Sequence, residues 1–237
     1  MKNKDTDYQR YRKSLSNCHL LENMDDLTFN SLISLFKEQT WPKNTCLVDE
    51  NRFLCKFYII ISGRVKMYQL DETSSKEVTL FLLHKGDFMD LFCLLDGLEH
   101  KVYYESLDEV KVLEVPMENL HDWFQKHPEY YKNLLFYAGK KLRRMENYIS
   151  DIIFANISTR LVKLLLRNVN KDSKNLELIN DLSHKEIAYL IGSTRAVVNR
   201  QIQKLKKNGS IHTSRENLQI IDLGILIEFL KKENNHE

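Results

Sequence analysis

The sequence lacks the marks of several common protein classes. Its four cysteines stand singly, with no CxxC pair and no nearby histidine at metal-ligand spacing, so neither a disulfide framework nor a metal site is indicated. No apolar run is long enough to span a membrane, and the opening residues MKNKDTDYQRYRK contain no apolar signal core. There is no P-loop, no nucleophile–base pair and no internal repeat. These absences argue against an enzyme or a membrane protein, and we expect a cytoplasmic protein with no membrane partner.

Charge is unevenly distributed along the 237 residues. From Ala155 onward, 14 Lys and Arg stand against 9 Asp and Glu, a net charge of +5; this leaves −3 for the preceding part of a chain whose total is +2. A basic C-terminal part behind a slightly acidic N-terminal part is typical of a nucleic-acid-binding module attached to a sensor or partner module.

The stretch from Leu182 to Lys207, LSHKEIAYLIGSTRAVVNRQIQKLKK, predicts two short helices joined by a tight turn. Ser183 and Glu186 can form a capping box on the first helix. Gly192 can end that helix, because glycine enters the left-handed conformation without steric cost. The apolar positions at helical spacing are Ile187, Leu190 and Ile191 on the first helix and Val198, Ile202 and Leu205 on the second, with the small Ala188 where the helices cross.

The second helix exposes a face that suits a DNA major groove. Arg195 and Arg200 can pair bidentately with guanine and Asn199 with adenine. The predicted backbone contacts are Ser193, Thr194, Lys204, Lys206 and Lys207, and either Ser193 or Thr194 can cap the helix. The alternative is a helical hairpin with a solvated basic face. Gln201 departs from the aliphatic residue often found there, so the packing is expected to differ.

The N-terminal half predicts a small antiparallel barrel or sandwich. An amphipathic helix is expected over Met24–Lys37, ended by Trp41-Pro42. Short apolar and β-branched runs separated by turn signals then predict strands over 57–61, 65–70, 77–83, 101–107 and 110–115.

The C-terminal half predicts mainly helices. A short helix over 117–126 precedes a long one over 128–153, whose apolar positions alternate in steps of four and three: Tyr131, Leu135, Ala138, Leu142, Met145, Ile149 and Ile152. This heptad seam predicts a two-stranded coiled coil between two copies; packing on the chain's own barrel is the alternative. Beyond a hinge at Ala155-Asn156, Ser158 is expected to cap a helix over 159–168. Strands over 210–215 and 218–222 would form a wing carrying His212, Thr213 or Arg215, and a helix over 223–232 follows.

This order of elements resembles the cyclic AMP receptor protein/FNR family of bacterial transcription regulators, over nearly the whole chain. The resemblance rests on the FYIIISGRVKMY hairpin at 57–68, the GDF turn at 86–88, the helix after His127-Pro128 and the helix-turn-helix stretch. It implies a homodimer on a palindromic double-stranded DNA site, with RNA polymerase as a further partner. Arg195 and Arg200 match the family's base-reading arginines, whereas Ala196 stands where many members have an acidic residue, so the half-site should differ at that base.

The sensor end departs from the cyclic-nucleotide pattern. Asp90-Leu91-Phe92 and Lys101-Val102 stand where the family has Gly-Glu-Leu for the ribose and Arg-Ser for the phosphate, and Met145-Glu146 replaces its Thr-Ser pair. Leu91 offers no acceptor to a ribose hydroxyl and Asp90 would repel a phosphate, which argues against cyclic AMP. An unknown effector in the barrel stays open, with Phe88, Leu91, Phe92, Lys101, Val102 and Tyr103 as the candidate pocket; core packing explains these residues equally well.

Other cofactors have little support in the residues. Cys18 alone near the N-terminus cannot supply the cysteines of the iron–sulfur cluster that the FNR branch holds. A thiol switch would pair Cys18 with Cys93, or Cys46 with Cys55, and haem would need His84 or His100; idle thiols and surface histidines are the simpler interpretation.

The sequence therefore predicts an α+β protein. Residues 1–126 would form an N-terminal antiparallel β-roll sensor domain of the cyclic-nucleotide-binding type. Residues 127–154 would be a long dimerisation helix and hinge, and 155–237 a winged helix-turn-helix domain. The predicted function is a homodimeric, sequence-specific DNA-binding transcription regulator. The rival hypothesis is a ligand-binding or protein-interaction module whose C-terminal domain docks a protein partner.

Overall fold

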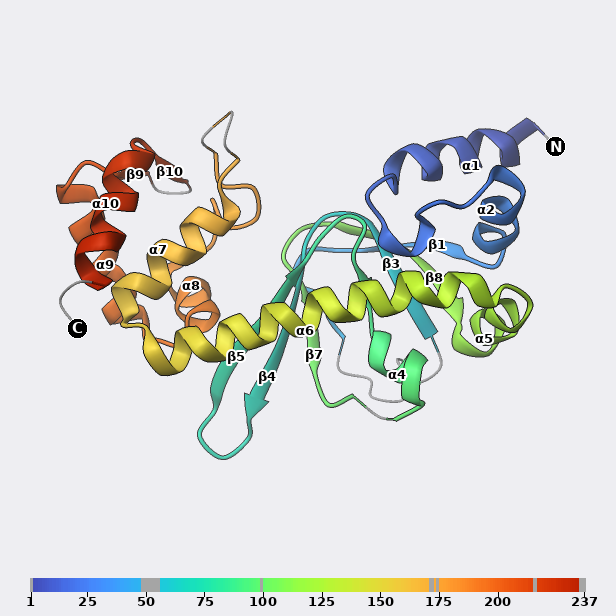
Figure 1. Ribbon diagram of the computed structural model, residues 1–237, viewed down its shortest axis with the longest axis horizontal. Coiled ribbons are helices and arrows are strands. Elements are labelled where there is room, and N and C mark those ends of the chain that lie inside the picture. Colours follow the sequence, from blue (N-terminus) through green and yellow to red (C-terminus); the bar gives the residue numbers. More distant parts are fainter. Residues whose placement is uncertain are drawn as a thin grey trace. The chain divides into compact units, whose positions relative to one another are not determined.

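The computed structural model describes residues 2–47, 56–98, 100–170, 173, 175–214 and 217–234. The chain divides into two compact units (Figure 1). Each unit has its own buried core. The first comprises Met1–Ser75 and Leu80–Arg143, and the second Lys76–Thr79 and Arg144–Glu237. In the part of the chain that is described, every helix is too short or too polar to cross a lipid bilayer.

The strands that precede the long helix form two four-stranded sheets. In spatial order one sheet holds β1 (Lys37–Trp41), β8 (Val110–Pro116), β3 (Lys56–Ser62) and β6 (Phe88–Met89), and the other holds β2 (Cys46–Leu47), β7 (Tyr103–Ser106), β4 (Val65–Asp71) and β5 (Lys76–Leu83). All the pairings with a resolved register are antiparallel. The predicted β-roll is confirmed, and the five expected runs correspond to β3, β4, β5, β7 and β8.

Strand β3 shows why its sequence is a continuous apolar run. Phe57 and Ile59 belong to the core formed with the helices, whereas Tyr58 and Ile60 belong to a second core with residues of both sheets. Because successive side chains point to opposite faces of a strand, a strand covered on both sides needs apolar residues at every position.

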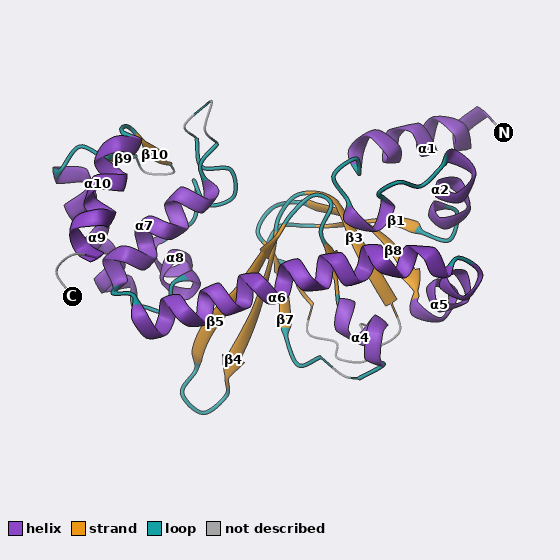
Figure 2. Ribbon diagram, in the orientation of Figure 1, coloured by secondary structure: helices purple, strands orange, loops and turns teal. Residues whose placement is uncertain are grey.

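Helices pack against the strands of the first unit (Figure 2). They are α1 (Lys2–Ser14), the 3₁₀ turn η1 (His19–Leu21), α2 (Asp26–Ile33), α4 (Leu91–Asp96), α5 (Met117–Lys126), the 3₁₀ turn η2 (Pro128–Tyr130) and α6 (Tyr131–Phe154). Residues of η1, α2, α5 and α6 form a common core with β3 and β8. The predicted helices over 117–126 and 128–153 correspond to α5 and, after η2, α6.

The helix predicted over Met24–Lys37 is too long. Asp25 caps α2 by accepting a hydrogen bond from the Thr28 N–H at 2.9 Å, but the helix ends at Ile33 and Lys37 already begins β1. Strand β1 lies at the edge of its sheet, where polar side chains are tolerated, so its sequence KEQTW carries no apolar alternation from which a strand could be recognised. The short elements β2, β6 and α4 were missed because runs of two to six residues have no readable period.

The second unit contains a winged helix-turn-helix. Its elements are α7 (Ile157–Asn168), α8 (His184–Leu190), α9 (Arg195–Lys207), β9 (Ile211–Thr213), β10 (Leu218–Ile220) and α10 (Leu223–Asn234). Strands β9 and β10 pair antiparallel as the predicted wing. Leu161, Leu165 and Leu226 are fully buried, which places α7 and α10 in the same core as the helix-turn-helix.

The cap predicted for α7 is wrong. Asn156, not Ser158, caps the helix, because its side-chain oxygen accepts from the Thr159 N–H at 2.9 Å. Ser158 lies inside the first turn, and its hydroxyl donates to the side-chain oxygen of Gln201 at 2.7 Å. This contact also explains why Gln201 stands where an aliphatic residue was expected: its half-buried side chain accepts the hydrogen bond from Ser158.

Candidate nucleic-acid interface

The start of α8 carries the predicted capping box. The Ser183 hydroxyl oxygen accepts from the Glu186 N–H at 3.2 Å, and the Glu186 carboxylate accepts from the Ser183 N–H at 2.7 Å. Two backbone donors at the helix start are thereby satisfied reciprocally. Gly192 follows α8 with a φ of 60°, as the turn requires.

The start of α9 is capped by Thr194. Its hydroxyl oxygen accepts from the Val197 N–H at 3.4 Å. Of the two candidate caps, Ser193 is therefore the residue that makes the turn: its N–H donates to the Ala188 carbonyl at 2.9 Å. The two caps set where each helix starts, and so which side chains α9 presents outward.

The inner faces of the two helices pack on each other. Buried there are Ile187, Ala188, Ile191, Val198, Ile202 and Leu205, while Leu190 is half-buried. Ala188 is 1% exposed, so this small residue lies buried within the motif. The predicted inner face is confirmed.

The outer face of α9 is exposed. The side chains that the sequence assigns to base reading are all solvent-accessible: Arg195, Ala196, Asn199 and Arg200. They lie on one face, because residues four apart are neighbours on a helix. Of the proposed backbone contacts, Thr194, Lys204 and Lys207 are exposed, whereas Ser193 and Lys206 are half-buried.

His184 is a neighbour of this face that the sequence reading missed. It is the first residue of α8, and its imidazole interacts with Asn199 and Arg195. Burial lowers the pKa of His184 and the Arg195 guanidinium lowers it further, while the Asn199 amide acts in the opposite direction. The only available signal was its place directly after the helix cap.

The wing supplies one exposed candidate, His212, and a half-buried one, Thr213. Both lie on β9, and His212 pairs with Gln219 of β10 in the register. The third candidate, Arg215, lies outside the described residues.

The heptad seam of α6 divides between two environments. Leu135, Leu142 and Ile149 are exposed by 61%, 63% and 52%. Tyr131 and Ala138 pack against the core of their own unit, and Met145 and Ile152 are half-buried. The outward strip is completed by Ile153, which is 64% exposed.

A cavity of about 40 Å³ lies in the first unit, between the roll and α6. Its lining comprises Met67, Phe81, Leu83, Phe88, Asp90, Leu91, Phe92, His100, Tyr104, Tyr137 and Lys141. Phe88, Leu91 and Phe92 were expected there. Lys101, Val102 and Tyr103 are not among the residues that line this cavity.

Strand alternation explains why these three side chains lie away from the cavity. Tyr104 turns inward on β7 and is buried, so the preceding Tyr103 faces the other side, where it stacks on Tyr68 with ring centroids 5.4 Å apart. Val102 packs against the core of the roll, and Lys101 is exposed.

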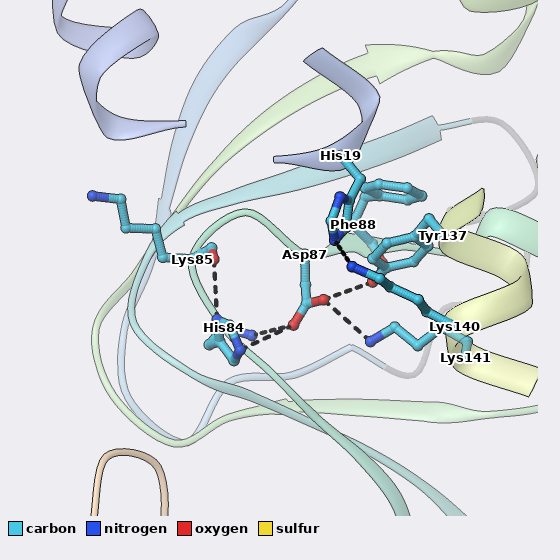
Figure 3. Close-up of polar contacts among 8 residues, drawn as sticks. All are labelled: His19, His84, Lys85, Asp87, Phe88, Tyr137, Lys140 and Lys141. Atoms are coloured by element: carbon cyan, nitrogen blue, oxygen red, sulfur yellow. Dashed lines mark hydrogen bonds and ion pairs between the residues drawn. The ribbon is translucent and has the colours of Figure 1, made fainter. Parts of the chain in front are cut away.

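One wall of the cavity holds a buried charged network that ties the 86–88 turn to α6 (Figure 3). Asp87 accepts from the Tyr137 hydroxyl at 2.8 Å, from the Lys141 ammonium at 3.2 Å and from the His84 N–H at 3.0 Å. Burial raises the pKa of Asp87, but Lys141, His84 and Tyr137 outweigh burial, so its pKa lies below the ordinary value. Phe88 stacks on Tyr137 with centroids 3.8 Å apart. The sequence signal was the spacing of Tyr137 and Lys141, four apart on one helix face.

Two of the thiols considered for a switch, Cys18 and Cys93, lie in surroundings that disfavour reaction. Cys18 and Cys93 are buried, and burial raises the pKa of each to about 12. Cys46 is exposed, and Cys55 lies outside the described residues. A thiol with so high a pKa supplies little thiolate, which is the reactive form.

The histidines considered for haem interact with the chain itself. His100 lies 3.3 Å from Asp90, and a ring nitrogen of His84 lies 3.0 Å from the Lys85 carbonyl. Across the described residues, no group of three His, Cys, Asp or Glu side chains is arranged to hold a metal ion.

Comparison with known families agrees with this architecture. The family model of the cyclic nucleotide-binding domain matches residues 38–127, and that of the Crp-like helix-turn-helix domain matches residues 159–229. The chain belongs to the cyclic AMP receptor protein/FNR family. Members of this family are transcription regulators rather than enzymes.

Relatives within the family span most of this chain. A CRP-like cAMP-activated global transcriptional regulator of Mycobacterium tuberculosis is 24% identical over 212 residues, which cover 88% of this chain and 94% of the relative. The c-di-GMP-responsive global regulator CLP of Xanthomonas campestris has a similar structure, with a TM-score of 0.72, 19% identity and coverage of 84% and 100%. A CooA mutant from Carboxydothermus hydrogenoformans has a TM-score of 0.70, 24% identity and coverage of 90% and 94%. Identities this low between the structures establish the fold alone.

Proposed function

We propose that this family member is a homodimer that regulates transcription by binding a palindromic DNA site, and that it does not respond to cyclic AMP. The observation that carries the DNA-binding part is the outer face of α9. Two arginines and an asparagine stand there exposed, on a helix whose start is set by the Thr194 cap and whose inner face is fully packed. An α-helix of this kind fits the major groove, where arginine and asparagine distinguish base pairs.

Within this face, Arg195 and Arg200 are the proposed guanine readers. Asn199 is the proposed adenine reader. Its hydrogen bond with His184 restricts the orientation of the Asn199 amide in the free protein. Ala196 has no acceptor for a cytosine amino group, so selection at that base pair is expected to be weak or different. Thr194, Lys204 and Lys207 are placed to meet phosphates, with Ser193 and Lys206 as less exposed contributors.

The proposed dimer contact is the exposed strip of α6. Leu135, Leu142, Ile149 and Ile153 are all more than half exposed in one chain, and the first three recur every seven residues. Apolar residues at this period form the contact line of a two-stranded coiled coil. A two-fold axis along the strip would present two copies of α9 to a palindrome. Such a regulator would act in the cytoplasm of a bacterium, on RNA polymerase at its promoters.

The sensor cavity supports the proposal that cyclic AMP is not the effector. Its volume of about 40 Å³ holds a few water molecules, each of which needs roughly 10–15 Å³ by this measure. Its cationic wall residue, Lys141, already forms an ion pair with the buried Asp87. Asp90, which also lines the cavity, is buried and would repel a phosphate. An effector small and apolar enough for this space stays compatible with the lining.

The decisive experiment is selection of bound sequences from a random DNA pool by the purified protein. Enrichment of a two-fold palindrome, with half-sites about one helical turn apart, is the expected result. Cyclic AMP at saturating concentration should leave both the enrichment and the affinity unchanged. Enrichment that needs cyclic AMP would overturn the effector part. If no sequence is enriched under any condition, with or without reductant and with or without added cell extract, a protein partner for α9 would be favoured instead.

A further inference from the structure

The junction between α6 and α7 is bridged by a buried carboxylate. Asp151, in the last turn of α6, accepts from the Lys163 ammonium at 2.6 Å and from the Arg167 guanidinium at 2.7 Å, one cation on each oxygen. The Asp151 side chain is only 11% exposed. Lys163 and Arg167 are four residues apart on α7, so they present both cations from one face. A change in the angle between the helices would leave a buried charge unpaired, which is strongly unfavourable.

The turn of the helix-turn-helix rests on the same end of α6. A Cβ built on Gly192 would lie 2.7 Å from the Ile152 methyl and 3.7 Å from the Tyr148 hydroxyl. The chain therefore approaches α6 at this point as closely as a glycine allows. Val or Ala in place of Gly192 would push the turn away from the helix.

Arg160 of α7 holds the turn from a second side. Its guanidinium donates to the Ile191 carbonyl at 2.8 Å and lies 3.4 Å from the Gly192 carbonyl oxygen. These carbonyls follow the end of α8, where a helix has unsatisfied acceptors and a partial negative charge. Together with the Ser158–Gln201 contact, α7 is thus bonded to both helices of the motif.

We propose that the last turns of α6, α7 and the helix-turn-helix form one rigid body, in which Asp151 and Arg160 are positioning residues that set the angle between the dimer helix and the recognition helix. The residues between α6 and α7, which the sequence marks as a hinge at Ala155-Asn156, are then braced rather than free. This inference rests on the proposed function, since the angle matters only if two recognition helices read one site. Its consequence is a sharp preference for one half-site spacing.

The test compares binding to the selected palindrome with binding to versions that have one base pair inserted or deleted between half-sites. The variant Asp151→Asn removes the charge that both cations meet. We expect its ratio of affinities between correct and altered spacing to fall by about fivefold or more, the lower range of a typical coupling between sites. Asp151→Glu should restore much of the ratio. Glu146→Gln, the same charge change at an exposed site on α6, should leave it at the wild-type value.

A purely stabilising ion pair predicts a different result: a lower unfolding temperature with an unchanged spacing ratio, which would overturn the proposal. Where Asp151→Asn does not fold, Arg167→Gln removes one of the two pairs from a cation that is half exposed. A second readout needs no DNA. Amide hydrogen exchange over residues 150–160 should be slow in the wild type and faster in Asp151→Asn. Fast exchange in the wild type would refute the proposed rigid body. If no palindrome is enriched, the proposed function fails, and the exchange measurement alone decides the rigid body.

Discussion

Replacing Gly192 by alanine tests how closely the DNA-binding turn approaches α6. Two separate costs are expected from the structure. The φ of 60° places an alanine in the left-handed region, and its Cβ would meet the Ile152 methyl at 2.7 Å. Both costs act on the second unit, in which α8 and α9 carry the proposed DNA contacts.

The magnitudes can be assigned separately. The left-handed conformation costs a residue with a Cβ about 1–2 kcal/mol. Forcing an extra methyl into a packed contact costs about 1–3 kcal/mol. The lower conformational freedom of unfolded alanine offsets about 0.4–1 kcal/mol of this. Gly192→Ala should therefore lower the free energy of unfolding by about 1–4.6 kcal/mol.

Gly209 provides a matched control in the same unit. Its φ is 80°, but a Cβ there would meet nothing within 4 Å. Gly209→Ala therefore carries only the backbone cost, about 0–1.6 kcal/mol after the unfolded-state offset. The difference between the two variants isolates the contact with α6. Adding Ile152→Ala to Gly192→Ala should recover part of that difference, as expected for residues in contact.

The assay must report on the second unit. Both tryptophans, Trp41 and Trp123, lie in the first unit, so denaturation is followed by far-ultraviolet circular dichroism and by hydrogen exchange of peptides from α8 and α9. Equal losses for the two glycine variants would refute the close contact with Ile152. An unchanged stability of Gly192→Ala would also refute the left-handed turn.

Three further predictions follow from the other sites. Arg200→Ala should weaken binding to the selected palindrome by about 1–3 kcal/mol in competition titrations; an equal loss on random DNA would exclude base reading. Leu142→Glu should shift the sedimentation coefficient from dimer to monomer, whereas Leu27→Glu, at an 85% exposed site on α2, should not; a dimeric Leu142→Glu protein would contradict the strip. The pKa of Asp87 is lower in the folded protein than the ordinary carboxyl pKa of about 3.9, because Asp87 pairs with Lys141. The ion pair therefore stabilises the folded protein fully above about pH 3.9, and this stabilisation is lost as the pH falls through the pKa of Asp87 in the folded protein. Asp87→Asn should therefore destabilise the first unit at neutral pH by roughly 3 kcal/mol and flatten its acid dependence, measured as denaturant midpoints between neutral and acid pH.

Much of the local structure was predictable, because it depends on residues close in sequence. The capping box of Ser183 and Glu186, the left-handed Gly192 and the bounds of α5 each follow from a stretch of ten residues or fewer. Strand β3 was recognisable because burial on both faces demands a continuous apolar run. The edge strand β1 was not recognisable, because it pairs with one strand only, β8, and its polar side chains can face solvent without any apolar pattern.

Errors at the candidate sites arose where the direction of a side chain depends on distant parts of the chain. Tyr104, not the expected Tyr103, lines the cavity, since the sequence around β7 does not reveal which of two adjacent tyrosines turns inward. Ser158 looked like a cap, but Gln201, 43 residues away, is the partner of its hydroxyl. His184 gained a place beside Asn199 only through the packing of α8 on α9.

The sequence by itself determined the family, the order of the modules and the outward face of α9, since each depends on local patterns and helical periodicity. Only the tertiary structure decided which seam residues of α6 stay exposed, how small the cavity in the first unit is, and that Lys141, which lines it, already pairs with Asp87. The physical reason is the same in each case. Burial, cavity volume and ion pairing are properties of groups brought together from distant positions, and no spacing along the chain specifies their distance.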